Sequence, residues 1–227
     1  MRACALCLLL PWFALNAHAA RPFVTDDARV ADPGGYQIES FYKRQNRSGE
    51  NEFWFLPAMN PGGRVELTLG GMRVANTLPG ASHTEIAQAK TLLKPLETNG
   101  TGYALTLGVA QVSPFLESRV TNPYLNAIGS FSIHGDRVVV HANLGAQRDR
   151  LAGLTRGTWG LGSEFVLAPR FIAIAESYGQ RGEKTTLHAG LRFWLIPDRV
   201  QIDGTFGYQN SGVPRRDFRS VGLRILF

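Results

Sequence analysis

Hydrophobic and polar residues alternate with a period of two along most of the chain, and turn-forming residues interrupt the alternation. In segment 184–196, Leu187 and Leu191 share one face of an extended chain. His188 and Arg192 share the opposite face. Because side chains of a β-strand point alternately to its two faces, this period predicts strands. Twelve candidate strands are indicated: 35–45, 51–57, 63–74, 84–94, 102–112, 123–134, 137–147, 157–168, 170–179, 184–196, 199–209 and 217–227.

The connections between these segments alternate between tight and longer ones. HGDR around Gly135 and LIPDR around Pro197 are tight, whereas SPFLESRVTN and RDRLAGLTRG are longer and more charged. Outer-membrane barrels combine short periplasmic turns with longer outer loops, and an even strand count returns the C-terminus to the periplasmic side. The sequence therefore predicts an all-β fold, a single closed antiparallel transmembrane β-barrel of about 12 strands.

A soluble sandwich or lipocalin-like barrel would alternate too, so other features must separate the two folds. The polar faces mix bulky charges with glycines, which suits a crowded lumen better than a solvated exterior. Terminal Phe227 resembles the signal that the barrel assembly machinery reads, which makes that machinery an expected partner. Aromatic residues on the apolar faces fall near strand ends, as in the two girdles of membrane barrels. We expect Tyr36, Tyr103, Phe171, Phe193 and Phe227 at the periplasmic rim and Tyr42, Tyr124, Trp159 and Tyr208 at the outer rim.

The N-terminus has the pattern of a cleaved signal peptide over residues 1–19. Arg2 precedes a short apolar stretch, and Ala-His-Ala at 17–19 is a small-residue cleavage site. We expect a periplasmic N-terminal arm at 20–34 and the barrel at 35–227, in the cell outer membrane. No uncharged apolar run long enough for a transmembrane helix follows the leader.

Composition excludes several classes of protein. Both cysteines, Cys4 and Cys7, lie within the leader, so the mature chain has no disulfide, thiolate metal site or cysteine nucleophile. The net charge of +6 is modest and dispersed, which argues against nucleic acid as a partner. The sequence indicates no cofactor and no metal site.

Strand parity assigns a set of polar residues to the lumen. They can fill it with cross-strand ion pairs, or they can line a narrow channel or a binding site for small solutes. The near balance of acids and bases argues against a strongly ion-selective pore. Segment 170–179 allows either face inward, and we expect Glu176 inward because a carboxylate facing lipid is costly. The expected lumen-lining or solute-binding residues are Glu39, Arg64, Glu66, Lys90, His141, Glu164, His188, Arg192, Asp203 and Arg224.

A lipid-modifying enzyme of the outer membrane needs a serine beside a histidine and a third, orienting group. His141 has Asn143 two positions on, and His188 has only Thr186 as a same-face hydroxyl neighbour. No single stretch places Ser and His together, although pairing between strands is not visible in the sequence. We therefore predict no catalytic residues.

Asp26 and Asp27 stand between the leader and the first strand, in the stretch RPFVTDDARV. Adjacent Asp side chains point apart in an extended chain, which disfavours a metal or catalytic pair. Thr25 and Asp26 suit turn or capping bonds. The functional hypothesis is that the arm folds into the periplasmic mouth and pairs an aspartate with lumenal Arg or Lys. Thr25, Asp26 and Asp27 are then a periplasmic plug.

The stretch RPFVTDDARVADPGGYQIESFY resembles the start of a family of small outer-membrane proteins named for the meta-pathway of phenol degradation. QAKTLLKP, with Lys90, is similar to a later strand of that family. Where many members have Gly after Asp-Asp-Ala, this chain has Arg29. The resemblance implies uptake of small compounds, aromatic ones included, across the outer membrane. It rests on Arg21, Pro22, Thr25, Asp26, Asp27, Ala28, Gly34, Gly35 and Glu39.

The leading functional hypothesis is a narrow channel or transporter for small solutes whose identity the sequence does not give. The alternatives are a structural or surface-interaction barrel with a plugged lumen and, third, a lipid-modifying enzyme. Membrane lipid is an expected partner. Arginines in the loops also favour contact with lipopolysaccharide phosphates, because a guanidinium binds them bidentately. They are Arg47, Arg119, Arg148, Arg150, Arg156, Arg181, Arg215 and Arg216.

Overall fold

The computed structural model describes residues 23–75, 81–113, 119–209 and 216–227. The predicted leader, residues 1–19, lies outside this part of the chain, as do Arg21, Pro22 and Arg215. The described residues form twelve strands. These are β1 (Tyr36–Gln45), β2 (Asn51–Met59), β3 (Val65–Ala75), β4 (Ser82–Lys94), β5 (Thr101–Ser113), β6 (Val120–Ile133), β7 (Val138–Asp149), β8 (Leu154–Ala168), β9 (Phe171–Gln180), β10 (Thr186–Ile196), β11 (Val200–Gln209) and β12 (Arg216–Leu226).

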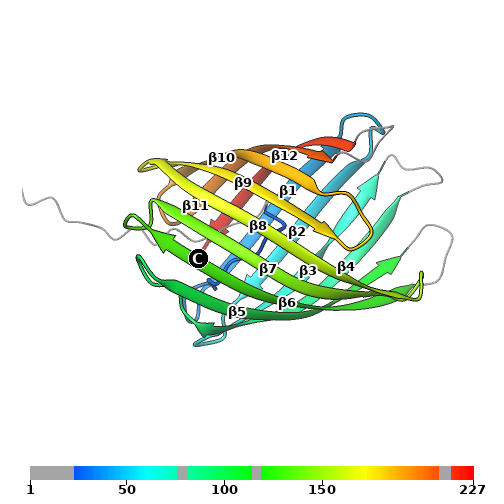
Figure 1. Ribbon diagram of the computed structural model, residues 1–227, viewed down its shortest axis with the longest axis horizontal. Helices are drawn as coiled ribbons and strands as arrows, with labels where there is room; N and C mark the ends of the chain where they lie inside the picture. The colour runs from blue at the N-terminus through cyan, green and yellow to red at the C-terminus, as the bar shows by residue number, and fades with distance from the viewer. Residues whose placement is uncertain (1–22, 76–80, 114–118, 210–215) are drawn as a thin grey trace, which may run out of the picture.

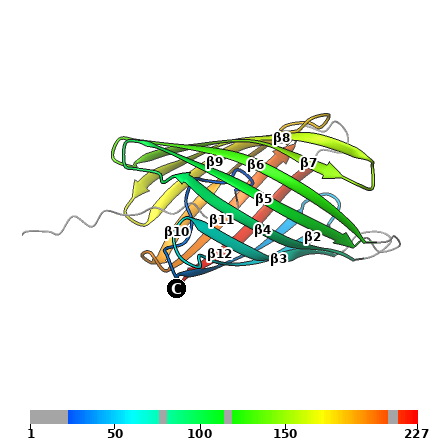
Figure 2. The ribbon, with the colours of Figure 1, turned by 90° about the horizontal axis from the view of Figure 1, so that it is seen from below.

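Each strand pairs antiparallel with its neighbours in the chain, and β1 also pairs with β12, so the sheet closes on itself (Figures 1 and 2). The closing ladder runs from Gln37 opposite Leu226 to Gln45 opposite Phe218. Closure leaves no unpaired strand edge, which is the condition for a sheet to sit in lipid. The predicted closed antiparallel barrel of twelve strands is confirmed. Within the described residues, no helix is long and apolar enough to cross a membrane.

The outer wall of the barrel is apolar and the inner wall is polar. Leu69 and Leu144 are 67% and 71% exposed, whereas their chain neighbours Thr68 and Asn143 are buried. In water a sheet turns its apolar face to the core, so the inverted pattern is that of a barrel surrounded by lipid. The predicted alternation of β10 has the same sense, with Leu191 outward.

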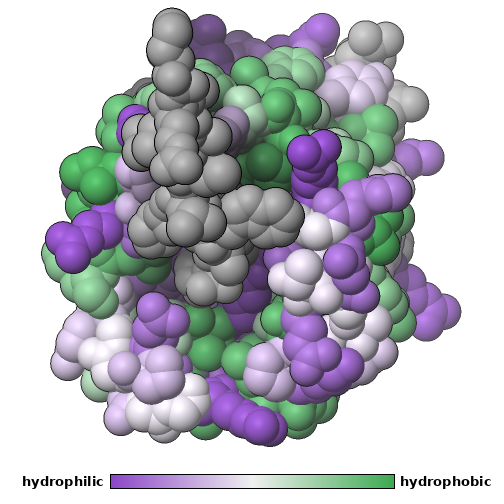
Figure 3. Space-filling model, turned by 90° about the vertical axis from the view of Figure 1, so that its left-hand side faces the viewer, coloured by the Kyte–Doolittle hydropathy of each residue, from purple (hydrophilic) through white to green (hydrophobic). Residues whose placement is uncertain are grey.

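The barrel has two distinct ends. The turn end is where β1 begins and β12 ends, marked by the C-terminus in Figure 1, and the loop end is opposite. Viewed from the turn end, hydrophobic residues lie along the flanks and hydrophilic ones project beside them (Figure 3). At this end His134, Gly135 and Asp136 have φ of 53°, 64° and 63°, so a run of left-handed residues makes the tight turn between β6 and β7.

The contrast between short turns and long loops is smaller than the sequence suggests. The stretch RDRLAGLTRG is largely strand, because β7 continues to Asp149 and β8 begins at Leu154. Residues predicted to be loop therefore belong to the barrel wall, which extends beyond the predicted ends of these two strands.

One predicted girdle residue is wrong. Tyr124 faces the lumen, where its hydroxyl donates to Gln88 Oε1 at 2.8 Å, and Leu125 faces outward instead. The physical reason is Gly108 on the adjacent strand β5, because its missing side chain leaves room for the ring of Tyr124 inside the barrel. The other predicted girdle residues lie on the outward face or, for Phe227, at the exposed chain end.

Residues 23–34, called the arm here, run inside the barrel as far as buried Ala31 and then turn, through exposed residues 32–34, into β1. Phe23 is buried against Ile172, Ile174 and Trp194, and Ala28 packs with Ala104 and Ile128. Near the turn end, the backbone of Gly34 donates to Asn60 O at 2.9 Å. The interior of the barrel is thus filled in part by the wall and in part by the N-terminus of the chain.

Candidate functional site

The structure places nine of the ten predicted lumen residues on the inner wall, mostly buried. They are Glu39, Glu66, Lys90, His141, Glu164, His188, Arg192, Asp203 and Arg224. Arg64 is the exception and a correction. It is exposed in the turn before β3, with Nη1 at 3.5 Å from Leu93 O. Its parity matches the lumen, but β3 begins at Val65, so the barrel wall has already ended where Arg64 lies.

Side chains of the wall hold the backbone of the arm. Glu176 accepts the N–H groups of Val24 and Thr25, at 3.0 and 2.9 Å. Asn143 accepts from the N–H of Asp26 at 2.7 Å and donates back to its carbonyl at 2.8 Å. This two-way contact is what a neighbouring strand would supply, so an amide side chain substitutes for backbone pairing.

Two further wall residues bind the arm backbone closer to the turn end. Ser130 Oγ accepts from the N–H of Ala28 at 2.9 Å, and Glu66 accepts from that of Ala31 at 2.8 Å. Asn60 donates to the carbonyl of Ala31 at 2.7 Å. Contacts from β3, β6, β7 and β9 thus fix the path of the arm, which satisfies its buried polar groups.

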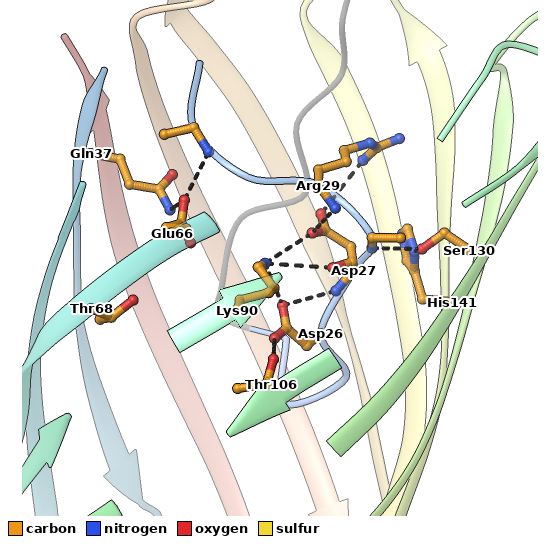
Figure 4. A network of polar contacts seen from close by, with 12 residues as sticks. Asp26, Asp27, Arg29, Gln37, Glu66, Thr68, Lys90, Thr106, Ser130 and His141 are labelled. Carbon is orange, nitrogen blue, oxygen red and sulfur yellow. Dashed lines mark hydrogen bonds and ion pairs between the residues drawn. The ribbon is translucent and has the colours of Figure 1, made fainter. Parts of the chain in front are cut away.

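Opposite charges join the arm to β4 (Figure 4). Lys90 Nζ lies 3.0 Å from Asp26 Oδ1 and 3.4 Å from Asp27 Oδ1. Asp26 also accepts from Thr106 at 3.3 Å. The adjacent aspartates therefore share one lysine, and no metal is needed to hold them together. In the described residues, no group of three or more His, Cys, Asp or Glu has the arrangement of a metal site.

A second ionic contact involves Glu164, which binds two arginines. Arg192 Nη1 lies 2.6 Å from Glu164 Oε1, and Arg29 of the arm lies 3.2 Å from Oε2. The Arg192 guanidinium also stacks over the ring of Phe23, 4.8 Å from its centroid. Arg192 therefore supports the arm both through charge and through the apolar face of its guanidinium.

Thr25 sits against β8 where the wall has glycines. A Cβ placed on Gly160 would lie 2.6 Å from Thr25 Oγ1, and one on Gly162 would lie 3.3 Å from Thr25 Cβ. These two inward glycines form a seat for Thr25, because any side chain there would occupy its place. The same seat explains why β8 carries glycine at positions that face the lumen.

A chain of hydrogen bonds crosses from the wall to the arm near the turn end. Arg224 Nε donates to Gln37 Oε1 at 3.0 Å, and Gln37 Nε2 donates to Glu66 Oε2 at 3.0 Å. Since Glu66 also binds Ala31, the chain links β12, β1, β3 and the arm. Arg224 lies 3.5 Å from Glu39 as well.

Cross-strand pairing creates hydroxyl–histidine contacts that no single stretch of sequence shows. Ser130 Oγ lies 2.8 Å from His141 Nδ1, and His188 lies 2.7 Å from both Thr205 Oγ1 and Glu176 Oε1. Ser130 and His141 have no exposed surface. Ser130 Oγ and Glu176 each accept a hydrogen bond from the arm backbone. The histidines beside them, His141 and His188, therefore orient the side chains that hold the arm.

A cavity of about 540 Å³ lies in the lumen beside the arm. Its lining extends to Gln180 and Gln209, the last residues of β9 and β11 at the loop end. Toward the turn end it meets the arm, from Phe23 to Val30, and the Arg224–Gln37–Glu66 chain. The arm and the wall residues that bind it thus bound the cavity from the middle of the barrel toward the turn end.

Sequence reasoning found the charged wall residues but missed several that bind the arm. Phe23, Gln37, Asn60 and Ser130 were not singled out, and Arg29 was noted only as a departure from the family's pattern. For Ser130 a signal was present, because Ser130 and Ser132 alternate with Phe131 and Ile133 in segment 123–134. Glu176 faces inward, as expected.

The fold is shared with solved outer-membrane channels. The KdgM porin in complex with disordered oligogalacturonate is 12% identical, with a TM-score of 0.62, over 83% of this chain and 98% of that chain. The NanC porin is 10% identical, with a TM-score of 0.63 and the same coverage. At such identities the likeness concerns the fold alone. No curated protein matches the chain.

A family match extends across nearly the whole sequence, from residue 5 to residue 227. Its description carries no activity. On the strength of this match, the chain belongs to the family described as "Uncharacterised conserved protein UCP029691".

Proposed function

We propose that the protein is a narrow outer-membrane channel or transporter for small uncharged solutes, and that the arm closes its lumen toward the turn end. The observation that carries this proposal is the cavity of about 540 Å³, which reaches the loop end and ends on the arm. A barrel with a purely structural role needs no such space, because side chains alone fill a small lumen.

Charge in the lumen favours uncharged solutes. The oligogalacturonate of the KdgM structure is a polyanion, and passage of a polyanion calls for unpaired basic side chains along its path. Here the basic groups Lys90, Arg192 and Arg224 each face a carboxylate of the wall or the arm. The sequence resemblance to the phenol meta-pathway family supports small aromatic compounds as candidate solutes of the same uncharged class.

A structural barrel with a permanently plugged lumen is the second candidate. The specific observation in its favour is the number of strands that bind the arm, including β4 through Lys90 and β9 through Glu176. The two candidates differ in whether the arm leaves the lumen of the folded barrel. A closed channel has a conducting state without the arm, and a structural plug has none.

Liposome swelling distinguishes these candidates. Proteoliposomes carrying the mature protein, or a variant without residues 23–32, are placed in isotonic arabinose, a small neutral solute. We expect the deletion to increase the swelling rate severalfold over the mature protein. If the deleted variant folds, as shown by heat-modifiable mobility on gels, and still admits no arabinose, the channel proposal fails and the structural role stands.

We further propose that the loop end contacts lipopolysaccharide. The described loop arginines at that end, Arg47, Arg119, Arg148, Arg150 and Arg181, are exposed. Exposed guanidinium groups suit the bidentate binding of phosphate. Loss of copurifying lipopolysaccharide on replacing Arg148 and Arg150 with Gln would support this contact, and retention would argue against it.

A further inference from the structure

The part of the cavity nearest the loop end, called the vestibule here, is lined mainly by neutral polar groups. Among the described residues that line it, the charged side chain is that of Glu183, exposed in the connection from β9 to β10. Thr84, Thr158 and Thr186 add hydroxyl groups. Five amides come from five different strands, so they surround the space: Gln88, Asn126, Gln147, Gln180 and Gln209.

Aromatic rings lie among these amides. Tyr124 lies over Gly108, where a Cβ would come within 2.4 Å of its ring, and it lines the cavity. Trp54 also lines the cavity and stacks on Phe41, with 5.3 Å between ring centroids and 13° between planes. Rings held flat by a glycine or by a second ring leave a face for a ligand to stack on.

This combination of groups selects for a particular ligand chemistry. Gln88, Asn126 and Gln209 each make a hydrogen bond within the protein already. A side-chain amide both donates and accepts, as a hydroxyl does, so the remaining donors and acceptors of the five amides match a molecule with several hydroxyls. The charged pair of the wall beside Trp54, Lys43 and Glu52, is already joined at 2.9 Å, so an entering ion would lose hydration without gaining a free counter-charge there. A phenol would use the rings, but its single hydroxyl would leave most of the amides unused.

We propose that the vestibule is a binding site for a neutral saccharide, whose ring face stacks on Tyr124 or Trp54 while its hydroxyls bind the surrounding amides. This inference rests on the proposed channel function and assigns its solute class. The cavity of about 540 Å³ falls in the range of small-ligand pockets, roughly 300–1,000 Å³.

The test measures binding to the mature protein, separately from transport. Isothermal titration is carried out in an amine-oxide detergent, because glycoside detergents carry the chemistry of the probe. The probes are glucose, glucuronate and phenol. We expect saturable binding of glucose, and binding of glucuronate that is weaker by about tenfold or more, because its carboxylate finds no partner.

Two vestibule variants and one control complete the experiment. Gln147→Ala and Tyr124→Leu should each weaken glucose binding by about three- to tenfold, the effect of losing one hydrogen-bonding or stacking group. Phe206→Leu, on the outward face of β11, should leave glucose binding unchanged.

Three results would each overturn the saccharide assignment: no binding of glucose, equal binding of glucuronate, or tighter binding of phenol than of glucose. Arabinose flux through the arm-deleted variant would survive that result, so failure of the ligand class and failure of the channel are distinguishable.

Discussion

The two halves of the lumen are built from the same twelve strands but differ in content. The turn-end half carries buried charges and contains the arm, with Glu66, Lys90 and Glu164 all in contact with arm residues. The loop-end half carries amides, threonines and aromatic rings around an open cavity, and its Lys43 and Glu52 pair with each other rather than with the arm. The same alternating pattern thus encodes a filled compartment and a hollow one, and the chemistry of the inward residues distinguishes them.

The contrast between the two halves assigns a role to the buried charges. Charges in a barrel lumen are readily interpreted as a conduction path, yet here Lys90, Glu164 and Arg192 are paired. Three of the charged partners of this set, Asp26, Asp27 and Arg29, belong to the arm. A buried charge is costly unless it is paired and hydrogen-bonded. The charged half therefore holds residues 23–31 of the arm in place, and the loop-end half is where we propose that solute binds.

Fixing the arm in place should have the largest effect on transport. A Cβ on Gly160 would lie 3.3 Å from Thr25 Cβ, close to the roughly 3.5–4.5 Å spacing of disulfides. In the reduced variant with Thr25→Cys and Gly160→Cys, the new side chain on Gly160 crowds the seat of residue 25, so we expect the arm to loosen and arabinose to pass. We expect oxidation to cross-link the two cysteines and to abolish this flux, with flux restored by dithiothreitol. The control pairs Thr25→Cys with Leu161→Cys, which faces outward and should not cross-link. Equal flux in the oxidised and reduced states would show that solute does not pass where the arm lies.

Removing the shared lysine should have the next largest effect. Lys90→Met leaves Asp26 and Asp27 buried without their cation, and breaking such a pair costs about 3–5 kcal/mol. We expect the arm to leave the lumen, flux to rise and the urea midpoint of unfolding to fall. The matched control, Lys43→Met, removes a lysine that is 21% exposed, against 8% for Lys90, and that pairs with Glu52 at 2.9 Å, so it should cost less. Equal effects of the two changes would contradict the division of the lumen.

Filling the seat of Thr25 should have an intermediate effect. Gly162→Val places methyl groups where Thr25 packs, and overpacking of this kind costs about 1–3 kcal/mol. Protease cleavage within the arm, followed by mass spectrometry, should become faster. Adding Thr25→Gly restores the space and should restore protection, whereas Gly204→Ala, where a Cβ meets nothing, should change neither. A lack of rescue would indicate that the valine disturbs β8 itself.

A single hydrogen bond at the arm should contribute least. Thr106→Val removes the 3.3 Å contact with Asp26 while Lys90 stays in place. The loss should be about 0.5–1.5 kcal/mol of unfolding free energy, measured by urea denaturation in detergent. Thr84→Val in the neutral half keeps all arm contacts and should lower the unfolding free energy by less.

The strands were predictable because period-two alternation is a local property of the chain. Leu187 to Leu195 alternate in the sequence as they do in the wall, and the residues assigned inward there lie inward. Arg64 and Tyr124 were misplaced for a different reason. Parity gives the face of a residue but not where the wall ends, as for Arg64, or whether Gly108 opposite makes room for a ring.

The partners of the arm were not predictable from the sequence in the same way. Asp26 reaches Lys90 and Asn143, on strands that are far apart along the chain. Such contacts depend on the register of several strands at once and on the depth to which the arm enters. The sequence did suggest the type of contact, an aspartate of the arm with a lumenal base, because an isolated charge inside a barrel needs a partner.

Single-channel conductance in planar bilayers tests the central claim most directly, that the arm is what separates a closed lumen from an open one. The mature protein and the variant without residues 23–32 are recorded under identical salt and voltage. We expect the variant to be open for most of the recording and the mature protein to be closed for most of it. Identical conductance and identical open time in the two proteins would contradict it.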